Sequence, residues 1–524
     1  MKNSVKVELV VLLSDYHVVE YLGINYIKAY LESKGIEAII ETIEPKNIDE
    51  LIVGIRNNGV SIVGFATYSN TIRSVLNACS RLKSEIPHVH ITLGGPQVTS
   101  YGKKILKDNE FIDSVIEGEG EYVFYNLVSR LASAESFLGI KGLTFRDADG
   151  QIIKNPAQEA IADLDELPFP DRTLFEQNKA DFIFISGGRG CMGRCTFCSQ
   201  SAVSSKKGIK RVRNRSPKNI VDEMELLHEK YKTSIFNMTE FTFDDPGEDG
   251  VNKAAGVYRE ILKRKLPISL QIYTRAEKVN DRSELHYRLG KEAGLDCIYL
   301  GVESGNERDL KLYNKKASVQ DNYNAIRLLT RLDIYTICGF IFFNPYSDYE
   351  TLQQNARFLY RSGMGHSLFL YMSRMEIFPQ SAIANRLKKD GLLSEDFDYR
   401  SDGYDYHFAN PRISELLNVL KLKLNPTLYD VDNKLAVEEK ILRRNYPKVY
   451  QKTTPLFSRL QEIRNDRLQI NYEVFMKLLD LSQNNATEQE LMDYYLQSEI
   501  DKYDHEIMYI FVQVYKQKQL LGTC

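Results

Sequence analysis

Strand-like apolar runs alternate with amphipathic helical runs along two long parts of this 524-residue chain, and this alternation limits what the chain can fold into. In the first part, up to about residue 130, stretches such as VKVELVVLL and VSIVGFATYS are separated by helical stretches such as YLGINYIKAYLESKG. Repeated strand–helix–strand units place strands parallel in one sheet and cover both of its faces with helices. We therefore expect an N-terminal α/β domain built on a doubly wound parallel sheet.

The alternation returns at about residue 182 with longer helical segments. Six apolar runs have the length and composition of buried strands: residues 182–186, 234–241, 269–275, 297–304, 335–343 and 367–375. Six strand–helix units are too few to close an eight-stranded barrel, so they predict an open, partial (β/α)6 barrel. The chemistry of such a barrel is expected at the carboxyl ends of its strands.

Two other stretches lack the alternation and suggest domain boundaries. Residues 141–178 hold a hairpin pattern, GLTFRDADGQIIKN, and a proline-bearing run, DLDELPFPDR, which together are typical of a linker. Towards the C-terminus the apolar spacing is helical only, as in TEQELMDYYLQSEIDKYDHEIMYIFVQVY. The predicted segments are an α/β domain at 1–140, a linker at 141–178, a partial barrel at 179–395 and a helical domain at 396–524.

Composition excludes several classes of function. The formal net charge of −3 provides no general attraction to nucleic acid or to an anionic membrane. The longest apolar runs, such as residues 335–343, are far shorter than a membrane span. The first residues turn acidic directly after their apolar stretch and offer no small-residue cleavage site. We therefore expect a cytoplasmic protein with no nucleic-acid or membrane partner.

Three of the seven cysteines stand together in RGCMGRCTFCSQ. Cys191, Cys195 and Cys198 have the spacing C-x3-C-x2-C, and they follow the first strand candidate of the barrel, in its first βα loop. An odd number of thinly spread cysteines is not a disulfide framework. The other cysteines inside apolar patterns are expected to be small buried core residues: Cys79, Cys297 and Cys338.

Three thiolates on one short loop can hold a metal. A closed tetrahedral zinc site needs four protein ligands, and no histidine lies near enough in the sequence to be the obvious fourth. A [4Fe–4S] cluster bound by three cysteines leaves one iron free for a small molecule. Zinc and buried structural thiols are the alternative interpretations.

The C-x3-C-x2-C spacing, with the aromatic Phe197 before the last cysteine, resembles the loop of the radical S-adenosylmethionine (SAM) superfamily. The resemblance implies that Cys191, Cys195 and Cys198 hold a [4Fe–4S] cluster whose free iron is chelated by the amino and carboxylate groups of SAM. It also implies an enzyme that cleaves SAM to methionine and a 5′-deoxyadenosyl radical.

Further matches to this superfamily follow in order at the ends of the later strand candidates. The segments NMTEF, TRAE, GVESGN and GFIFFNP resemble those that line SAM. The resemblance assigns Glu240 to the amino group of SAM, Arg275 to its carboxylate, Glu303 and Ser304 to its ribose and carboxylate, and Gly339 and Ile341 to its adenine. Thr239 and Phe343 depart from the superfamily pattern, in which an aspartate and a glycine are common there.

The N-terminal domain has a resemblance of its own. LGGPQVT and EGEGE, followed by DLDELPFPDR, are similar to the Rossmann-like cobalamin (B12)-binding domain that precedes many radical SAM cores. It implies cobalamin contacts at the carboxyl ends of the strands, from Thr67, Tyr68, Gly94, Gly95, Pro96 and Glu119. Glycine at such positions lets the backbone approach a large planar ligand.

Two features of the sequence leave the cobalamin prediction open. The D-x-H-x-x-G signature that supplies an axial histidine to cobalt is missing, because Glu20 and Tyr21 follow Asp15 and His17 where the glycine would stand. Cobalamin-dependent radical SAM enzymes usually lack that histidine as well. The basic run KKGIKRVRNR (206–215) is interpreted either as a solvated loop or as a contact for phosphate or carboxylate groups of SAM, cobalamin or substrate.

Two hypotheses about function follow from the resemblance. The first is a cobalamin-dependent methyltransferase of the class B type, acting at an unactivated carbon or phosphorus of a biosynthetic substrate. The second is a radical oxidoreductase, lyase or cyclase whose N-terminal domain does not use cobalamin. Either enzyme would act on a small molecule or a peptide and take electrons from a donor such as flavodoxin or ferredoxin. The C-terminal helices are expected to cap the barrel mouth, and the sequence does not name the substrate.

Overall fold

The computed structural model describes residues 5–13, 20–99, 101–178, 182–204, 211–378, 381–394, 399–400 and 405–519. The chain divides into two compact units. Unit 1 is Met1–Arg189, Ser204–Leu227 and Glu395–Tyr404, and unit 2 is Gly190–Val203, His228–Ser394 and Asp405–Cys524. The division into four segments made from the sequence stays a prediction.

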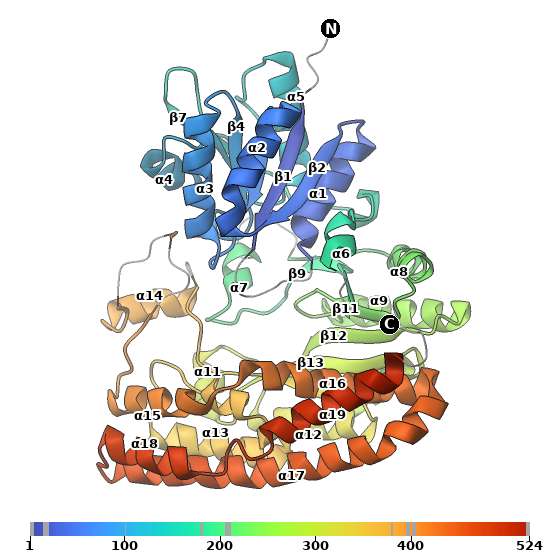
Figure 1. Cartoon of the computed structure of the whole chain (residues 1–524), viewed down its shortest axis with the longest axis vertical. Helices are drawn as coiled ribbons and strands as arrows, with labels where there is room; N and C mark the ends of the chain where they lie inside the picture. The colour runs from blue at the N-terminus through green and yellow to red at the C-terminus, as the bar shows by residue number, and fades with distance from the viewer. Residues whose placement is uncertain are drawn as a thin grey trace. The chain divides into compact units, whose positions relative to one another are not determined.

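The sheet of unit 1 has seven strands in the order β2-β1-β3-β4-β5-β6-β7, and the five strands from β2 to β5 run parallel (Figure 1). The strands are β1 (Val7–Leu12), β2 (Ala38–Ile43), β3 (Ile62–Ala66), β4 (His90–Gly94), β5 (Ser114–Ile116), β6 (Leu143–Arg146) and β7 (Ile152–Lys154). The helices are α1 (Leu22–Ser33), α2 (Ile48–Asn58), α3 (Ile72–Glu85), α4 (Gly102–Asp108), α5 (Glu121–Ser133) and α6 (Thr173–Asn178), with 3-10 helices η1 (Pro45–Asn47) and η2 (Leu164–Glu166).

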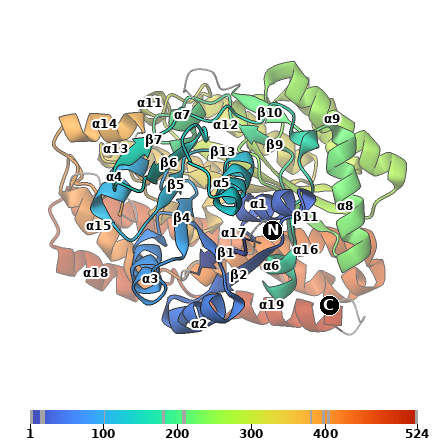
Figure 2. The same ribbon diagram turned by 90° about the horizontal axis from the view of Figure 1, so that it is seen from above.

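Helices cover both faces of this sheet (Figure 2). On one face Val10 and Phe65 pack with residues of α2 and α3, and on the other Leu9 and Val11 pack with residues of α1 and α5. Because both faces are covered, every residue of β1 is buried, and the strand is apolar except for Glu8. The predicted doubly wound α/β sheet is confirmed.

The hairpin expected inside the linker extends this sheet. β6 and β7 pair antiparallel around the turn at Asp149 and Gly150, and Leu143 of β6 lies opposite Ile116 of β5. Leu143 and Phe145, two residues apart, both lie in the core. Residues 143–154, which were assigned to the linker from the sequence, thus extend the sheet, because their period-2 pattern packs against the domain that precedes them.

Between the sheet of unit 1 and the barrel strands of unit 2, the chain forms β8 (Ile183–Ile185), β9 (Gly188–Gly190), α7 (Ser199–Ser204), β10 (Val212–Asn214) and α8 (Pro217–Tyr231). The strands of unit 2 run parallel in the order β14-β13-β12-β11. They are β11 (Ile235–Met238), β12 (Ser269–Arg275), β13 (Leu295–Glu303) and β14 (Tyr335–Phe340). Between and after them lie α9 (Gly247–Arg264), α10 (Glu284–Glu292), α11 (Glu307–Leu312), α12 (Val319–Arg331), α13 (Tyr349–Ser362) and α14 (Ala382–Lys389), with 3-10 helices η3 (Ala276–Lys278), η4 (Asp281–Ser283), η5 (Met364–His366) and η6 (Leu368–Met372).

Five of the six strands predicted for the partial barrel form, and the sixth does not. Residues 368–372 make the 3-10 helix η6, and only a single bridge, between Phe343 and Arg374, joins this segment to the chain beyond β14. The amide groups of Phe342 and Phe343 both donate to the carbonyl of Ser373, which replaces a regular ladder. An apolar run of this length does not by itself separate a strand from a buried helical turn, which is why the prediction failed.

The C-terminal part is helical, as predicted, and packs within unit 2. Its helices are α15 (Arg412–Leu420), η7 (Lys421–Lys423), α16 (Pro426–Asn445), α17 (Pro447–Gln483), α18 (Glu488–Gln497) and α19 (Asp504–Gln519). Val437 and Ile441 of α16 pack against Cys297 of β13 and Ile337 of β14. Side chains alternate along a strand, so Gly301 of β13 shares the face of Cys297 and lies nearer the carboxyl end. α16 thus covers the amino-terminal half of the sheet face that carries the candidate site.

Several helix starts follow the capping patterns of the sequence. The Ser318 side chain accepts the N–H of Asp321, whose carboxylate in turn accepts the N–H of Ser318, and the same reciprocal arrangement joins Thr487 and Glu490. Each of these capping boxes satisfies N–H groups that a helix end otherwise leaves unpaired. In the part of the chain that the structure describes, no helix is long and apolar enough to cross a membrane.

Glu8 gives the fold a titratable element. It is 3% exposed on β1, and burial together with a hydrogen bond to Glu41 raises its pKa from 4.5 to about 8. Between these two values the folded chain keeps a proton that the unfolded chain has released, so the free energy of unfolding falls as the pH rises through this window. Glu8→Gln removes this titration. Between pH 5 and pH 8 we therefore expect the free energy of unfolding of the variant to rise, relative to that of the wild type, by up to a few kcal/mol. Urea unfolding of both proteins across that range measures the difference, and parallel pH profiles would contradict the prediction.

Candidate functional site

The three clustered cysteines lie in the short loop between β9 and α7. The Gly193 N–H donates to Cys191 Sγ at 3.2 Å, and the Cys198 N–H donates to the Cys195 carbonyl at 3.4 Å. A Cβ atom on Gly193 would lie 3.3 Å from Cys191 Sγ and 3.7 Å from Cys195 Sγ. Two thiols therefore converge on this glycine, and a side chain there would crowd them.

The chemistry of these thiols fits a thiolate-bound cluster. They are half-buried and free of disulfides. Burial raises the pKa of Cys195 to about 11 in spite of the opposing charge of Lys315, and burial also raises the pKa of Cys198. Neighbouring thiolates repel one another, and cationic iron removes that repulsion by binding them. Three cysteines of this kind suit a [4Fe–4S] cluster, in which each thiolate binds a different iron.

A single zinc ion was the alternative considered from the sequence. Among the described residues, no group of three His, Cys, Asp or Glu side chains lies close enough to hold one metal ion. A structural zinc site would need such a group, whereas thiolates that bind separate irons of a cluster stand farther apart.

Asp245, which the sequence reasoning missed, holds the cysteine loop. Its Oδ2 accepts the N–H of Met192 at 3.1 Å, and its Oδ1 lies 2.6 Å from Lys278 Nζ. The Asp245 side chain is 1% exposed, and it belongs to the segment FDDP that follows β11. A carboxylate in the loop that follows a barrel strand was a signal that could have pointed to it.

Arg275, predicted to contact SAM, lies beside the cysteine loop. Its Nη1 would be 3.4 Å from a Cβ atom on Gly193, and the guanidinium pairs with Glu277 at 3.0 Å and with Asp245 at 3.5 Å. Burial lowers the pKa of Arg275, but these carboxylates and the nearby thiols outweigh that effect and raise it. The structure therefore places a permanent positive charge next to the thiols.

Glu303 ends β13 in the left-handed region, with φ of 65°, and pairs with a lysine that the sequence reasoning missed. Its Oε1 lies 3.1 Å from Lys315 Nζ, and the lysine side chain is only 3% exposed. Burial lowers the pKa of Lys315, but Glu303 and Cys195 outweigh that effect and raise it, so the ammonium stays charged. A charged lysine beside both the thiols and a carboxylate can bind an anionic ligand group. Lys315 is far from the cysteines in the sequence, so no local motif pointed to it.

Two glycines make room around the Glu303–Lys315 pair. A Cβ atom on Gly301 would lie 2.9 Å from Glu303 Oε1 and 3.1 Å from Lys315 Nζ. Gly339, predicted beside adenine, is exposed although its neighbours in β14 are buried, and a Cβ atom there would lie 3.8 Å from Glu303 Oε2. The residues present thus fit a ligand such as SAM at the carboxyl ends of β12, β13 and β14.

Glu240 lies in a buried position that differs from the open one expected for a ligand contact. Its Oε1 is 3.3 Å from Lys253 Nζ, and both side chains are buried. Its Oε2 is also buried and has no hydrogen-bond partner among the described residues. The carboxylate is therefore paired through one oxygen and keeps the other available as an acceptor.

Two other predicted SAM contacts are engaged within the fold. The Ser304 hydroxyl donates to Asn355 Oδ1 at 2.9 Å inside a buried polar network. Ile341 is 8% exposed, and its N–H donates to the Glu303 carbonyl at 2.8 Å. Ser304 and Ile341 therefore shape the segment around Glu303, and their contacts to SAM stay predictions.

The glycines predicted to contact cobalamin have different surroundings in unit 1. Gly95 has φ of 108°, and a Cβ atom on it would lie 2.5 Å from the Thr67 carbonyl oxygen. The ends of β3 and β4 approach closely here, since the Thr67 N–H and hydroxyl both donate to the Gly94 carbonyl. Packing of the chain against itself is therefore enough to require glycine at position 95, and its contact with cobalamin stays a prediction. A Cβ atom on Gly94 would meet no described atom within 4 Å, so Gly94 fits a position that a ligand could approach.

Glu119 is tied into unit 1. It lies 2.7 Å from Arg213 and 3.2 Å from Arg189, and it accepts the N–H of Ile161 at 2.8 Å. Arg213 and Arg215 end the basic run, and Arg215 pairs with Glu223 in a similar way. Both interpretations of the run are wrong for these two arginines, because they are buried against carboxylates of the chain itself. Residues 206–210 lie outside the described residues.

The remaining predicted cobalamin contacts lie at the same edge of the sheet. Tyr68 is half-buried, with its ring 5.4 Å from that of Tyr21, and Pro96 is exposed. Asp15 and His17 lie outside the described residues. Thr67, Tyr68, Gly94 and Pro96 are thus brought together by strand ends, whereas Glu119 is engaged elsewhere.

Two parts of the chain match known protein families. Residues 185–359 match the family model of the Radical SAM superfamily, and residues 8–128 match that of the B12 binding domain. An uncharacterized methyltransferase of Pyrococcus horikoshii is 26% identical over 66% of this chain and 74% of its own length. An anaerobic magnesium-protoporphyrin IX monomethyl ester cyclase of Cereibacter sphaeroides is 32% identical over 52% of this chain, which spans 44% of the cyclase.

Two solved structures share the fold. The cobalamin-dependent SAM radical enzyme OxsB, with aqua-cobalamin and SAM bound, matches 99% of this chain and 80% of its own with a TM-score of 0.70 and 17% identity. The radical SAM methyltransferase TsrM from Kitasatospora setae matches 80% of this chain and 89% of its own with a TM-score of 0.63 and 15% identity. At these identities the likeness concerns the fold.

The fold and the matched domains define a radical SAM enzyme that carries a B12-binding domain. Residues 185–359 form a radical SAM domain and residues 8–128 a B12-binding domain, so the cofactors that these domains imply are a [4Fe–4S] cluster, SAM and cobalamin. The family and the fold class predicted from the sequence are confirmed.

A substitution at Gly94 tests whether cobalamin binds at the carboxyl ends of β3 and β4, whereas a substitution at Gly95 does not. Gly94→Leu places a side chain in open space, so we expect a folded protein that loses cobalamin uptake and still cleaves SAM. Gly95→Leu should instead lower the melting temperature, because a side chain there meets the Thr67 backbone. Bound corrin absorbance and thermal melts measure both effects. Normal cobalamin uptake by Gly94→Leu would contradict the placement of the ligand at this edge.

Lys315 can be tested apart from the cluster. Lys315→Met keeps the length of the side chain but removes its charge, so we expect SAM affinity to fall about tenfold or more, as for a lost charge-assisted hydrogen bond, while iron content is kept. Equilibrium binding of SAM and iron analysis measure the two effects, and the exposed neighbour Lys316→Met is the matched control. Loss of iron together with SAM affinity would mark Lys315 as part of the cluster's support instead.

Proposed function

We propose that this protein is a cobalamin-dependent radical SAM methyltransferase acting at an unactivated centre of a small biosynthetic substrate. The observation that carries the proposal is the gathering of three half-buried thiols, Arg275 and the Glu303–Lys315 pair at the strand ends of unit 2. The same chain has a B12-binding domain, and a relative described as a methyltransferase matches two thirds of it.

In this proposal Cys191, Cys195 and Cys198 hold the cluster, and Arg275 and Lys315 hold the carboxylate of SAM. When bound, the cluster supplies the electron that cleaves SAM to methionine and a 5′-deoxyadenosyl radical, and cobalamin supplies the methyl-carrying cobalt. Arg275 presents N–H donors to a carboxylate from the end of β12, and Lys315 presents them from the segment between α11 and α12. Such charge-assisted bonds are stronger than neutral ones.

Other residues of the chain would orient the ligand. The Glu303 carboxylate faces Gly301 and Gly339, and its second oxygen, Oε2, can accept the hydroxyl protons of a ribose. Glu240 Oε2, buried and unpaired among the described residues, can accept an ammonium N–H. α16 closes the amino-terminal half of the same sheet face with apolar side chains, which excludes water from one side of the site. Fixed donors and acceptors around a dry cavity hold reacting groups in one geometry.

A second candidate function is a radical oxidoreductase, lyase or cyclase that does not use cobalamin. It is favoured by one observation, that the cyclase relative is 32% identical over about half of this chain. The two candidates differ in whether a methyl group moves from SAM to the product and whether cobalamin is bound. The proposed partners are a small-molecule or peptide substrate and an electron donor such as flavodoxin or ferredoxin, and the proposed location is the cytoplasm.

The proposed function is tested with SAM that carries a deuterated methyl group. Anaerobically reconstituted, cobalamin-replete protein with reductant and candidate substrates should form 5′-deoxyadenosine and a product that carries the labelled methyl. Cys191→Ala, Cys195→Ala and Cys198→Ala should each lose the cluster and both products, because each thiolate binds its own iron. Cys79→Ala, which changes a buried core thiol of unit 1, is the matched control and should keep both. Formation of 5′-deoxyadenosine without cobalamin uptake would favour the second function, and its formation by a triple alanine variant would contradict both.

A further inference from the structure

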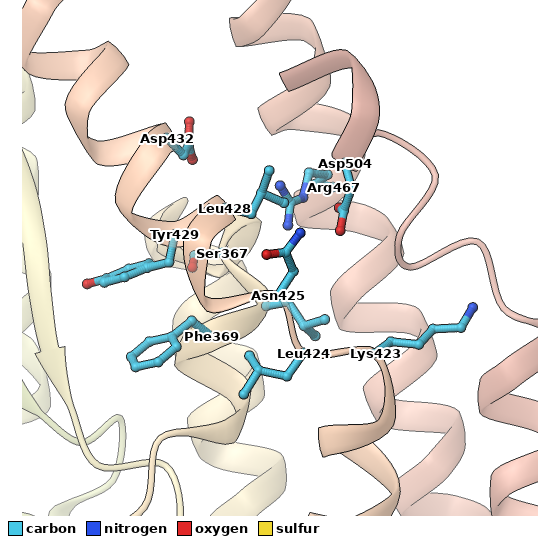
Figure 3. Close-up of a pocket in the computed structure, with 11 residues that line it drawn as sticks. Ser367, Phe369, Lys423, Leu424, Asn425, Leu428, Tyr429, Asp432, Arg467 and Asp504 are labelled. Atoms are coloured by element: carbon cyan, nitrogen blue, oxygen red, sulfur yellow. The ribbon is translucent and has the colours of Figure 1, made fainter. Parts of the chain in front are cut away.

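A small pocket lies among α16, α17 and α19, in the helical part of unit 2 (Figure 3). Figure 3 shows the rings of Phe369 and Tyr429 on one side of it, and Arg467 and Asp504, from α17 and α19, on the other. The pocket offers about 20 Å³, enough for one small polar group. The pocket is separate from the cysteine loop, and the proposed function does not use it.

Arg467 projects into this pocket (Figure 3), and no residue that the structure describes pairs with it. The residue is 6% exposed, and its Nε is buried with no hydrogen-bond partner. Among the described residues, its guanidinium forms neither an ion pair nor a hydrogen bond. Arg464, one turn earlier on α17, is buried too, but its Nε and Nη2 donate to Asp432 Oδ1 at 2.9 and 2.7 Å. One helix thus carries one satisfied and one unsatisfied buried arginine.

The two acids near Arg467 do not satisfy it. Asp432 is taken by Arg464 and lies 3.4 Å from the ring of His366. Asp504 lines the same pocket, and burial raises its pKa even though the charge of Arg467 opposes this. Burial lowers the pKa of Arg467 itself, against the attraction of both acids. An unpaired buried charge costs several kcal/mol of free energy, so its presence calls for an explanation.

We propose that this pocket binds the carboxylate of an organic ligand, with Arg467 donating to it and Phe369 and Tyr429 flanking its apolar part. A guanidinium presents two parallel N–H groups that match a carboxylate, and the enclosed space suits that small planar group. The rings of Phe369 and Tyr429 are stacked, with centroids 4.5 Å apart, and Phe369 is 37% exposed. The rest of the ligand would therefore extend from the pocket over an aromatic surface.

The test uses three small probes on the purified full-length protein, measured by calorimetry. Benzoate has the carboxylate and an aromatic ring, acetate has the carboxylate alone, and benzamide is the neutral counterpart of benzoate. We expect benzoate to bind about tenfold more tightly than acetate, because its ring covers apolar surface, and benzamide not to bind measurably. Absence of benzoate binding to the wild type, which would leave a buried water as the filler of the pocket, would overturn the proposal.

Two variants and a control assign the binding to this pocket. Arg467→Met should weaken benzoate binding about tenfold or more, and Phe369→Ala should bring benzoate down to the affinity of acetate. Arg459→Met is the matched control, because Arg459 lies on the same helix but pairs with Glu506 at the surface, and it should bind benzoate as the wild type does. Equal affinity of Arg467→Met and the wild type would overturn the proposal.

Thermal melts without probes separate a binding role from a structural one. Arg467→Met removes an unpaired buried charge, so we expect the variant without ligand to melt no lower than the wild type. The proposal would be overturned if Arg467→Met melted at a lower temperature than the wild type and Phe369→Ala bound benzoate as the wild type does. Arg467 would then have a structural role in the fold. These measurements need neither the cluster nor SAM cleavage, so the proposed function and this inference can fail independently.

Discussion

Three thiols held in one short loop repel one another once ionised, and the arrangement of unit 2 meets this constraint. Asp245 fixes the loop through the Met192 N–H, while Arg275 and Lys315 bring positive charge beside the thiols. Asp245 follows β11, Arg275 ends β12, and Lys315 is held by Glu303 at the end of β13. Parallel strands end at one edge of their sheet, so groups far apart in sequence meet at the loop.

The helical region covers part of the sheet face that carries the candidate site. α16 lays Val437 and Ile441 over the amino-terminal half of the sheet face, and the polar groups of the site lie along the carboxyl-terminal half. The same bundle holds two buried arginines one turn apart: Arg464 is paired, whereas Arg467 has no partner among the residues that the structure describes. The attraction of a partner offsets part of the cost of burying a charge, so Arg467 is the costlier of the two to bury.

Unit 1 shows how one residue type can be required for different reasons. Gly95 is needed because the Thr67 backbone approaches it, whereas Gly94 faces open space, although both were first interpreted as ligand contacts. Likewise the arginines of the basic run, read as solvated or ligand-binding, are buried against Glu119 and Glu223. A run of basic residues in the sequence gives the number of charges, but the tertiary packing determines the ion-pair partner of each one.

The sequence by itself determined the alternation that gives the two α/β parts, the helical C-terminus, the capping boxes and the cysteine spacing. These features are local, since strand and helix periods and the reach of one loop are set by neighbouring residues. The tertiary structure decided that residues 143–154 join the sheet and that residues 368–372 leave it. It also brought Lys315 to Glu303 and placed Tyr399 in the core of unit 1, where Asn109 donates to its hydroxyl at 2.8 Å. Such pairings join residues far apart in sequence, and no periodicity records them, because they depend on how complete elements pack.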